Sequence, residues 1–239
     1  MLVTTKAIVI STLKYGDTSL IAKCFTLSSG MKTYLLKGVL ASKKGKIKAA
    51  YFQPLTLLDI IARHKDKGNM ESLKDVKVNY PYQSLHMDIR KNAIAFFLSE
   101  VINNSIGEEE ENPALFQYLE TAFKWLDTHE KIANFHIVFL INLTKYIGFY
   151  PDDSNKNLPF FDLSEGAFTE YASRDTISDE NLTHFKSFLG INFDDIDEVK
   201  LFKKQRQSLL EVIITYFELH LHGFKKPKSL IVLNEVFNL

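Results

Sequence analysis

The sequence contains almost no cysteine: Cys24 is the one thiol among 239 residues. A single cysteine excludes an internal disulfide and a four-cysteine metal site. Cys24 stands inside the apolar stretch SLIAKCFTL, which is typical of a strand, and there a thiol is expected to be an inert core residue. This cysteine usage fits a reducing compartment.

Long apolar runs are missing as well. No run reaches the roughly 18 residues that a membrane-spanning helix needs. The first residues have too short an apolar part for a signal peptide, and no small-residue cleavage site follows them. Because 46% of the residues are hydrophobic, a packed core is expected all the same. We therefore expect a cytoplasmic protein.

Motifs that carry catalysis are also absent. The sequence has no G-x-S-x-G elbow, no H-E-x-x-H and no C-x-x-C. A phosphate-binding loop is excluded because Gly38 and Gly45 are too far apart and Ile47, which follows Lys46, has no hydroxyl. His136 falls on an apolar helix and is expected to be a core histidine. We expect no enzyme, no catalytic residue, no metal site and no cofactor.

What the sequence does have is a charge asymmetry hidden by a net charge of zero. Residues 1–80 carry 14 Lys/Arg and 5 Asp/Glu, a net charge of +9, and residues 81–239 carry the compensating −9. Six lysines and no acid fall within residues 31–48 alone, MKTYLLKGVLASKKGKIK. Such an asymmetry indicates an anionic partner for the first half.

The hydrophobic pattern changes near residue 80. Before it, short β-rich segments alternate with Gly-containing turns and predict five strands, at 5–12, 19–27, 31–40, 47–62 and 71–79. Five closely spaced strands favour a small antiparallel barrel of the oligonucleotide-binding (OB) type, although the strand count alone also allows an SH3-like barrel. After it the period is helical.

The predicted class is therefore α+β, with an OB-type barrel at 1–80 and a helical domain at 81–239. An irregular insert, with a small hairpin around Glu165-Gly166, is expected at 150–172. Pro113 is expected at the first position of a helix, where its missing N–H costs nothing.

The lysine-rich stretch supplies the candidate binding residues. Repulsion among its cations would be relieved by phosphate contacts, which also release counterions. Aromatic rings beside cations suit single-stranded nucleic acid, because every base can stack. Strand alternation puts Lys32 and Tyr34 on one face, and Tyr15 lies in the preceding turn. The predicted nucleic-acid contacts are Lys32, Tyr34, Lys37, Lys43, Lys44, Lys46, Lys48, Tyr51 and Arg63. A merely solvated basic hairpin is the alternative.

Four segments are spread over most of the chain: AIVISTLKYGDTSLIAKCFT (7–26), LLKGVLASKKGKIKAAYFQPLTLLDI (35–60), YIGFYPD (146–152) and KPKSLIVLNEVF (226–237). In this order and spacing they resemble the RecO family of bacterial DNA repair proteins. The resemblance implies a recombination mediator that binds single- and double-stranded DNA and anneals complementary strands. It also implies action with RecR in loading the RecA recombinase on DNA coated by single-strand-binding protein.

The resemblance further implies that the helical domain recognises the acidic C-terminal tail of that coating protein. An apolar notch with a basic rim would suit such a tail. The candidate residues are Lys203, Lys204, Arg206, Lys225 and Lys226, with ordinary helix-surface charges as the alternative reading.

The sequence departs from many relatives in one segment. Where they carry a four-cysteine zinc module after the YxPD motif, SNKNLPFFDLSEGAFTEY has no cysteine. We expect this segment to be held instead by packing of Phe160, Phe161, Phe168 and Tyr171. A protein-interaction scaffold and an RNA-binding OB protein remain alternatives to the mediator, since both share its surface chemistry.

Overall fold

The computed structural model describes residues 1–41, 47–65, 70–107 and 110–237. The chain divides into two compact units, Met1–Thr128 and His129–Leu239. The change from strands to helices comes near residue 80, as in the sequence pattern, whereas the boundary between the compact units falls after the second helix.

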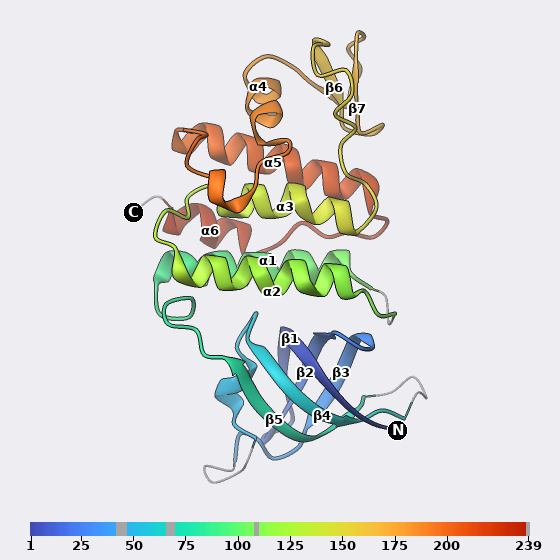
Figure 1. Ribbon diagram of the computed structural model, residues 1–239, viewed down its shortest axis with the longest axis vertical. Helices are drawn as coiled ribbons and strands as arrows, with labels where there is room; N and C mark the ends of the chain where they lie inside the picture. Colours follow the sequence, from blue (N-terminus) through green and yellow to red (C-terminus); the bar gives the residue numbers. More distant parts are fainter. Residues whose placement is uncertain (42–46, 66–69, 108–109, 238–239) are drawn as a thin grey trace. The chain divides into compact units, whose positions relative to one another are not determined.

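Five strands form the sheet of the first unit (Figure 1). Their order in the sheet is β3-β2-β1-β4-β5, and all neighbouring strands are antiparallel. The strands are β1 (Leu2–Tyr15), β2 (Ser19–Thr26), β3 (Gly30–Leu36), β4 (Leu57–Arg63) and β5 (Ser72–Tyr80).

The sheet closes on itself between β3 and the start of β5. The N–H of Leu35 donates to the carbonyl of Glu71 at 2.9 Å, and the N–H of Glu71 donates to the carbonyl of Thr33 at 2.7 Å. This bridge is parallel, with Tyr34 opposite Glu71. A bulge in β1 between Val9 and Ser11 lets one long strand pair with both β2 and β4. The predicted OB-type barrel is confirmed.

The fourth predicted strand is wrong in its first half. Residues Ala49–Phe52 form a short 3-10 helix, and β4 begins only at Leu57. Pro54 has no N–H for a strand ladder, and Leu55 has a positive φ of 64°. The N–H of Leu55 still donates to the carbonyl of Val9 at 2.7 Å, so this connection packs against β1.

Small and branched side chains fill the barrel interior together with the rings of Tyr34 and Phe52, and Cys24 is among the small ones with 1% exposure. Burial raises the pKa of the Cys24 thiol to about 12. The thiol therefore stays protonated near neutral pH, and the prediction of an inert core cysteine is confirmed.

Two helices complete the first unit, α1 (Ile89–Ser105) and α2 (Pro113–Thr128). Pro113 stands at the first helical position, as predicted. The rings of Phe25 and Phe116 stack at 6.1 Å, and Lys6 pairs with Glu120 at 3.0 Å. These contacts cover part of the outer barrel surface with helix.

The second unit is helical around α3 (Phe135–Tyr146), which is buried at every position from Phe135 to Thr144. His136 lies there with 2% exposure, so the predicted core histidine is confirmed. Within the described ranges, no helix is both long and apolar enough to cross a membrane. The other helices are α4 (Asp179–Phe188), α5 (Lys203–His220) and α6 (Leu230–Val236), with a 3-10 turn at Phe193–Asp195.

The cysteine-free insert folds as a small three-stranded sheet of β6 (Phe160–Asp162), β7 (Ala167–Thr169) and β8 (Thr176–Ile177). The predicted hairpin at Glu165-Gly166 joins β6 and β7. Phe161 packs on Phe168 at 4.9 Å and on Phe185 at 4.7 Å, as expected. Phe160 is half-buried. The expectation for Tyr171 is wrong, because its side chain is 77% exposed.

Candidate nucleic-acid interface

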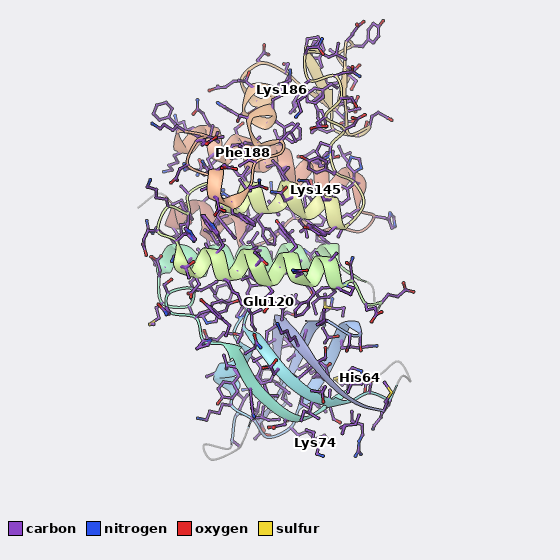
Figure 2. All side chains as sticks on the ribbon, viewed as in Figure 1. His64, Lys74, Glu120, Lys145, Lys186 and Phe188 are labelled. Carbon is purple, nitrogen blue, oxygen red and sulfur yellow. The ribbon has the colours of Figure 1, made fainter. Side chains whose placement is uncertain are left out.

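A groove of about 630 Å³ opens on the barrel beside the closure between β3 and β5. Three lysines line it: Lys37 follows β3, Lys65 follows β4 and Lys74 lies on β5. Lys74 is labelled in Figure 2. All three side chains are exposed. Apolar groups complete the lining, from Leu35, Val39, Ile47, Met70 and Leu73. The groove therefore combines three exposed lysines with an apolar lining.

The geometry of the groove explains why these cations are free to meet an anion. None of the three lysines makes an ion pair with another described residue. The acid in the groove, Glu71, is 5% exposed, and both of its carboxylate oxygens accept from the backbone N–H of Lys65, at 3.0 and 2.9 Å. Its carboxylate is thus hydrogen-bonded to the backbone of Lys65 and forms no ion pair with any described lysine side chain.

An apolar row runs across the outer face of the barrel toward this groove. The register places Leu13 opposite Ile21, and Ile21 opposite Leu35. Leu13 is 66% exposed, and Tyr15 on the same face of β1 is 52% exposed. In OB barrels the face of the second and third strands, with the loop joining the first two, is where oligonucleotides bind. Tyr15 is suitably placed for base stacking on that face.

The predicted stacking role of Tyr34 is wrong. Its ring points into the barrel with 0% exposure, and its hydroxyl shares a 3.0 Å hydrogen bond with Nε2 of His64. Burial, together with the neighbouring Cys24 and Glu71, raises the pKa of Tyr34 well above its usual value. A base cannot reach this ring in the folded barrel, because core side chains surround it.

The other predicted contacts differ in their exposure to solvent. Lys32 shares the face of Tyr34, as predicted, but that face turns inward: Lys32 stands opposite the core residue Cys24 and is half-buried. Lys48 is exposed, with its Nζ 6.0 Å from the ring centre of Tyr51, and Tyr51 packs partly against the core.

Arg63 is exposed at the end of β4. Lys43, Lys44 and Lys46 lie outside the described residues. The structure thus brings Lys37 of the predicted set into the groove, and it adds Lys65 and Lys74, which sequence reasoning missed. Strand alternation could not have found Lys74, because it puts Lys74 on the same face as the buried Val76. The register shift between β4 and β5, where Ile61 pairs with Asp75 and Ala62 with Leu73, leaves Lys74 exposed instead.

Two other lysines of the barrel are already engaged. Lys6 pairs with Glu120, as described above, and Lys23 donates from Nζ to Oδ1 of Asn103 at 3.0 Å. Burial lowers the pKa of Lys23. These two cations hold α1 and α2 on the barrel. The net charge of residues 1–80 therefore overstates the number of lysines that are available to an anionic ligand.

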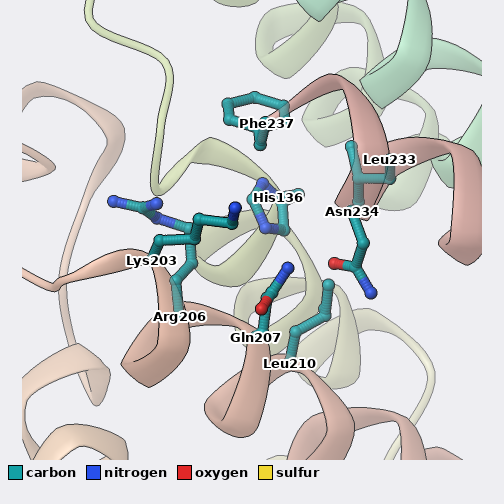
Figure 3. Close-up of a pocket in the computed structure, with 8 residues that line it drawn as sticks. All are labelled: His136, Lys203, Arg206, Gln207, Leu210, Leu233, Asn234 and Phe237. Atoms are coloured by element: carbon teal, nitrogen blue, oxygen red, sulfur yellow. The ribbon is translucent and has the colours of Figure 1, made fainter. Parts of the chain in front are cut away.

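The second unit contains a shallow notch between α3, α5 and α6 (Figure 3). His136, Leu210, Leu233 and Phe237 form its apolar part, and Lys203 and Arg206 stand on its rim. Sequence reasoning expected an apolar notch with a basic rim in the helical domain and named both of these cations.

Arg206 forms no ion pair with any residue that the structure describes, and it lies beside the neutral imidazole of His136. Arg206 donates from Nε to Oδ1 of Asn134 at 3.0 Å and from Nη2 to the carbonyl of Leu201 at 3.1 Å. These acceptors are uncharged, and burial lowers the pKa of Arg206. Burial, and then the charge of Arg206, lower the pKa of His136 to about 3, which keeps its imidazole neutral near pH 7.

The remaining candidates for partner binding do not line this notch. Lys204 lines a separate polar groove between α4 and α5, with Asp179 and Glu180. Lys225 and Lys226 are exposed in the segment that follows α5. Of the five predicted residues, the structure brings Lys203 and Arg206 together at one site.

The closed five-stranded topology, with its parallel bridge between β3 and β5, defines the first unit as an OB-type barrel. Residues 1–82 match the family described as "Recombination protein O N terminal". Residues 86–230 match "Recombination protein O C terminal". The chain belongs to the RecO family, whose members act in DNA repair and recombination.

Full-length relatives agree with this assignment. The chain is 52% identical over 238 residues to "DNA repair protein RecO" of Christiangramia forsetii, covering 99% of this chain and 100% of the relative. It is 49% identical to the protein of that name from Flavobacterium psychrophilum, with both chains covered completely. The Phocaeicola vulgatus protein of that name is 32% identical, again over the whole of both chains.

Proposed function

We propose that the protein is a non-enzymatic recombination mediator that binds single- and double-stranded DNA through its barrel and anneals complementary strands. In the same proposal it acts with RecR to help load RecA on DNA coated by single-strand-binding protein. The observation that carries the proposal is the groove of Lys37, Lys65 and Lys74 on an OB-type barrel, in a chain of a DNA repair family.

The groove supplies both parts of a nucleic-acid contact. Its lysines can meet successive phosphates, and each phosphate neutralised releases counterions. The exposed ring of Tyr15 can stack on a base, which adds affinity with little sequence preference. Lys48 and Arg63 are exposed further contacts, and Lys43, Lys44 and Lys46 extend the same proposal on their sequence alone. We therefore expect a strong dependence on salt and a weak dependence on sequence.

The notch of the second unit is the proposed site for the acidic tail of the single-strand-binding protein. Arg206 and Lys203 would pair with tail carboxylates, and the apolar wall of His136, Leu210 and Leu233 would hold an apolar side chain. A half-buried guanidinium with uncharged partners gains most from such an anion, because the pair is partly shielded from water.

The direct test is annealing of complementary strands coated with the cognate single-strand-binding protein, with and without its acidic tail. The proposal expects the protein to accelerate annealing, and expects the acceleration to fall when the tail is removed. No acceleration with either form of the coating protein would contradict the mediator function. A protein-interaction scaffold whose barrel contacts an acidic protein surface would also fail this test, and its variant without Lys43, Lys44 and Lys46 would lose the protein partner yet retain DNA binding.

A further inference from the structure

Glu71 is a buried carboxylate with spare capacity to accept hydrogen bonds. It lines the groove of the barrel and is 5% exposed. Both of its oxygens accept from one and the same donor, the backbone N–H of Lys65. A carboxylate offers about four acceptor positions, and the described residues supply no further donor to this one. A buried acceptor with so few donors is stabilised by a ligand that donates to it.

The backbone holds Glu71 in a fixed position. Its N–H donates to the carbonyl of Thr33 at 2.7 Å, and its carbonyl accepts from the N–H of Leu35 at 2.9 Å. The hydrogen bonds from Lys65 hold the side chain itself. A side chain that is already ordered loses little further freedom when a ligand binds. Glu71 is therefore suited to a directional hydrogen bond rather than to loose charge pairing.

The surroundings of Glu71 indicate which donor fits. The three lysines of the groove would repel a second ammonium or guanidinium group, so the donor should be uncharged. Apolar side chains, among them Leu35 and Leu73, line the same groove and suit a flat apolar ring. The exocyclic amino group of a nucleobase is an uncharged donor on such a ring, and the attached phosphates are attracted by the lysines.

From this geometry we propose that Glu71 reads one unpaired base of the bound DNA strand by accepting a hydrogen bond from its exocyclic amino group. Cytosine, adenine and guanine carry such a group, and thymine does not. Thymine would instead turn a carbonyl oxygen toward the carboxylate, which leaves two acceptors facing each other. This inference rests on the proposed binding of DNA in the groove, and it adds a base preference at one position.

The contact belongs to single strands. In a duplex the amino group is engaged in base pairing and the base is stacked between its neighbours. An unpaired base can turn its edge toward Glu71 while the adjacent phosphates meet the lysines of the groove. The expected preference is about fivefold for cytosine over thymine, the low end of the range for a contact to a base edge.

The test compares labelled oligocytidine and oligothymidine of equal length, bound to the full-length chain at one salt concentration and measured by fluorescence anisotropy. Glu71→Gln keeps a carbonyl oxygen for the N–H of Lys65 and adds an NH₂ donor, which suits thymine. This variant is expected to lose the preference for cytosine and to shift toward thymine. A role in barrel stability alone would weaken both oligonucleotides equally, so an unchanged preference would overturn the inference.

Asp59→Asn is the matched control. Asp59 is an exposed acid of β4 whose carboxylate accepts from the side chain of Asn79, and it does not line the groove. The control removes the same charge from the same barrel. It is expected to keep the preference for cytosine that the unaltered protein has, and loss of that preference would overturn a specific role of Glu71.

A second measurement needs no substitution in the protein, because Glu71 also takes part in closing the barrel. An oligonucleotide of pyrimidin-2-one bases carries cytosine without its amino group. The unaltered protein is expected to bind it about fivefold more weakly than oligocytidine. Equal affinities would overturn base reading by Glu71, whatever the stability of the Glu71→Gln variant.

Replacing Lys37, Lys65 and Lys74 together by Ala separates this inference from the proposed function. If that variant binds oligocytidine as tightly as the unaltered protein does, the groove is not the DNA site and the proposed function there fails. If it loses binding while the unaltered protein binds the cytosine and pyrimidin-2-one oligonucleotides equally, the groove stands and the role of Glu71 is overturned.

Discussion

Tyr15 and Tyr34 are two tyrosines of the same barrel with opposite environments. Tyr15 presents half of its surface to solvent, while Tyr34 is a core residue whose hydroxyl bonds to His64. Sequence alternation placed Lys32 and Tyr34 on one face correctly, but alternation alone does not say which face of a closed barrel points inward. The fully buried ring became apparent only with the structure.

Replacing Tyr15 by Ala is expected to weaken single-stranded DNA binding by about 1–3 kcal/mol, the usual contribution of one stacked base. Tyr34→Phe is the matched change: it keeps the ring and removes the hydrogen bond to His64. It should leave DNA affinity unaltered and lower the free energy of unfolding by about 0.5–1.5 kcal/mol. Anisotropy with labelled oligothymidine and urea denaturation measure the two effects. Equal DNA affinity of the Tyr15→Ala variant and the unaltered protein would refute stacking at this position.

His136 gives a pH dependence whose sign follows from its lowered pKa. The unfolded imidazole takes up its proton near pH 6.5, whereas burial keeps the folded one neutral down to about pH 3. Between these values the unfolded state binds more protons, so stability is full above pH 6.5 and falls as the pH is lowered.

The expected loss is about 1.4 kcal/mol for each pH unit within that window, relative to a His136→Leu variant that cannot titrate. Urea denaturation of both proteins over a pH series measures the difference. A constant difference from pH 7 to pH 4 would show that the imidazole is not held neutral by the fold.

At the scale of elements, the cysteine-free insert shows how aromatic packing stabilises a segment. Phe161 joins β6 to α4 through Phe185, and the Tyr216 hydroxyl of α5 donates to the carbonyl of Phe149 at 2.8 Å. Gly166 makes the β6–β7 turn with a positive φ of 67°, and an added Cβ would lie 2.8 Å from the Tyr216 hydroxyl. The turn therefore needs glycine for two separate reasons.

Gly166→Ala is expected to lower the free energy of unfolding by about 2–4 kcal/mol, from backbone strain and from the clash with Tyr216 together. Gly190→Ala is a matched control, because Gly190 has a φ of 86° and no atom within 4 Å of its added Cβ. That variant should lose about 1 kcal/mol. Thermal denaturation measures both losses. Equal losses of unfolding free energy in Gly166→Ala and Gly190→Ala would contradict a clash with Tyr216.

Most elements could be predicted from sequence, because their signals are local. Pro113 marks the start of α2, and Glu165-Gly166 marks the hairpin of β6 and β7. The exception is the stretch before β4, where Leu55 adopts a positive φ that only its tertiary hydrogen bond to Val9 explains. Likewise Lys65 and Lys74 meet Lys37 through barrel closure, which joins residues far apart in sequence.

For the whole molecule, the asymmetry of +9 and −9 between residues 1–80 and 81–239 is the sequence feature most closely tied to function. The structure refines it, since Lys6 and Lys23 are engaged with α2 and α1, while Lys37, Lys65 and Lys74 face a groove. Charge counting can indicate an anionic partner, but the three-dimensional groove decides which cations can contact it together.

The proposed binding of DNA in the groove of the barrel is tested most directly by the salt dependence of single-stranded DNA affinity. Replacing Lys37, Lys65 and Lys74 together by Ala should reduce the slope of log K against log salt by about two units, since three phosphate contacts are lost. The control variant removes the same charge from exposed lysines of the second unit, Lys131, Lys200 and Lys228, and should keep the original slope. Equal slopes for the groove variant and the unaltered protein would contradict the account.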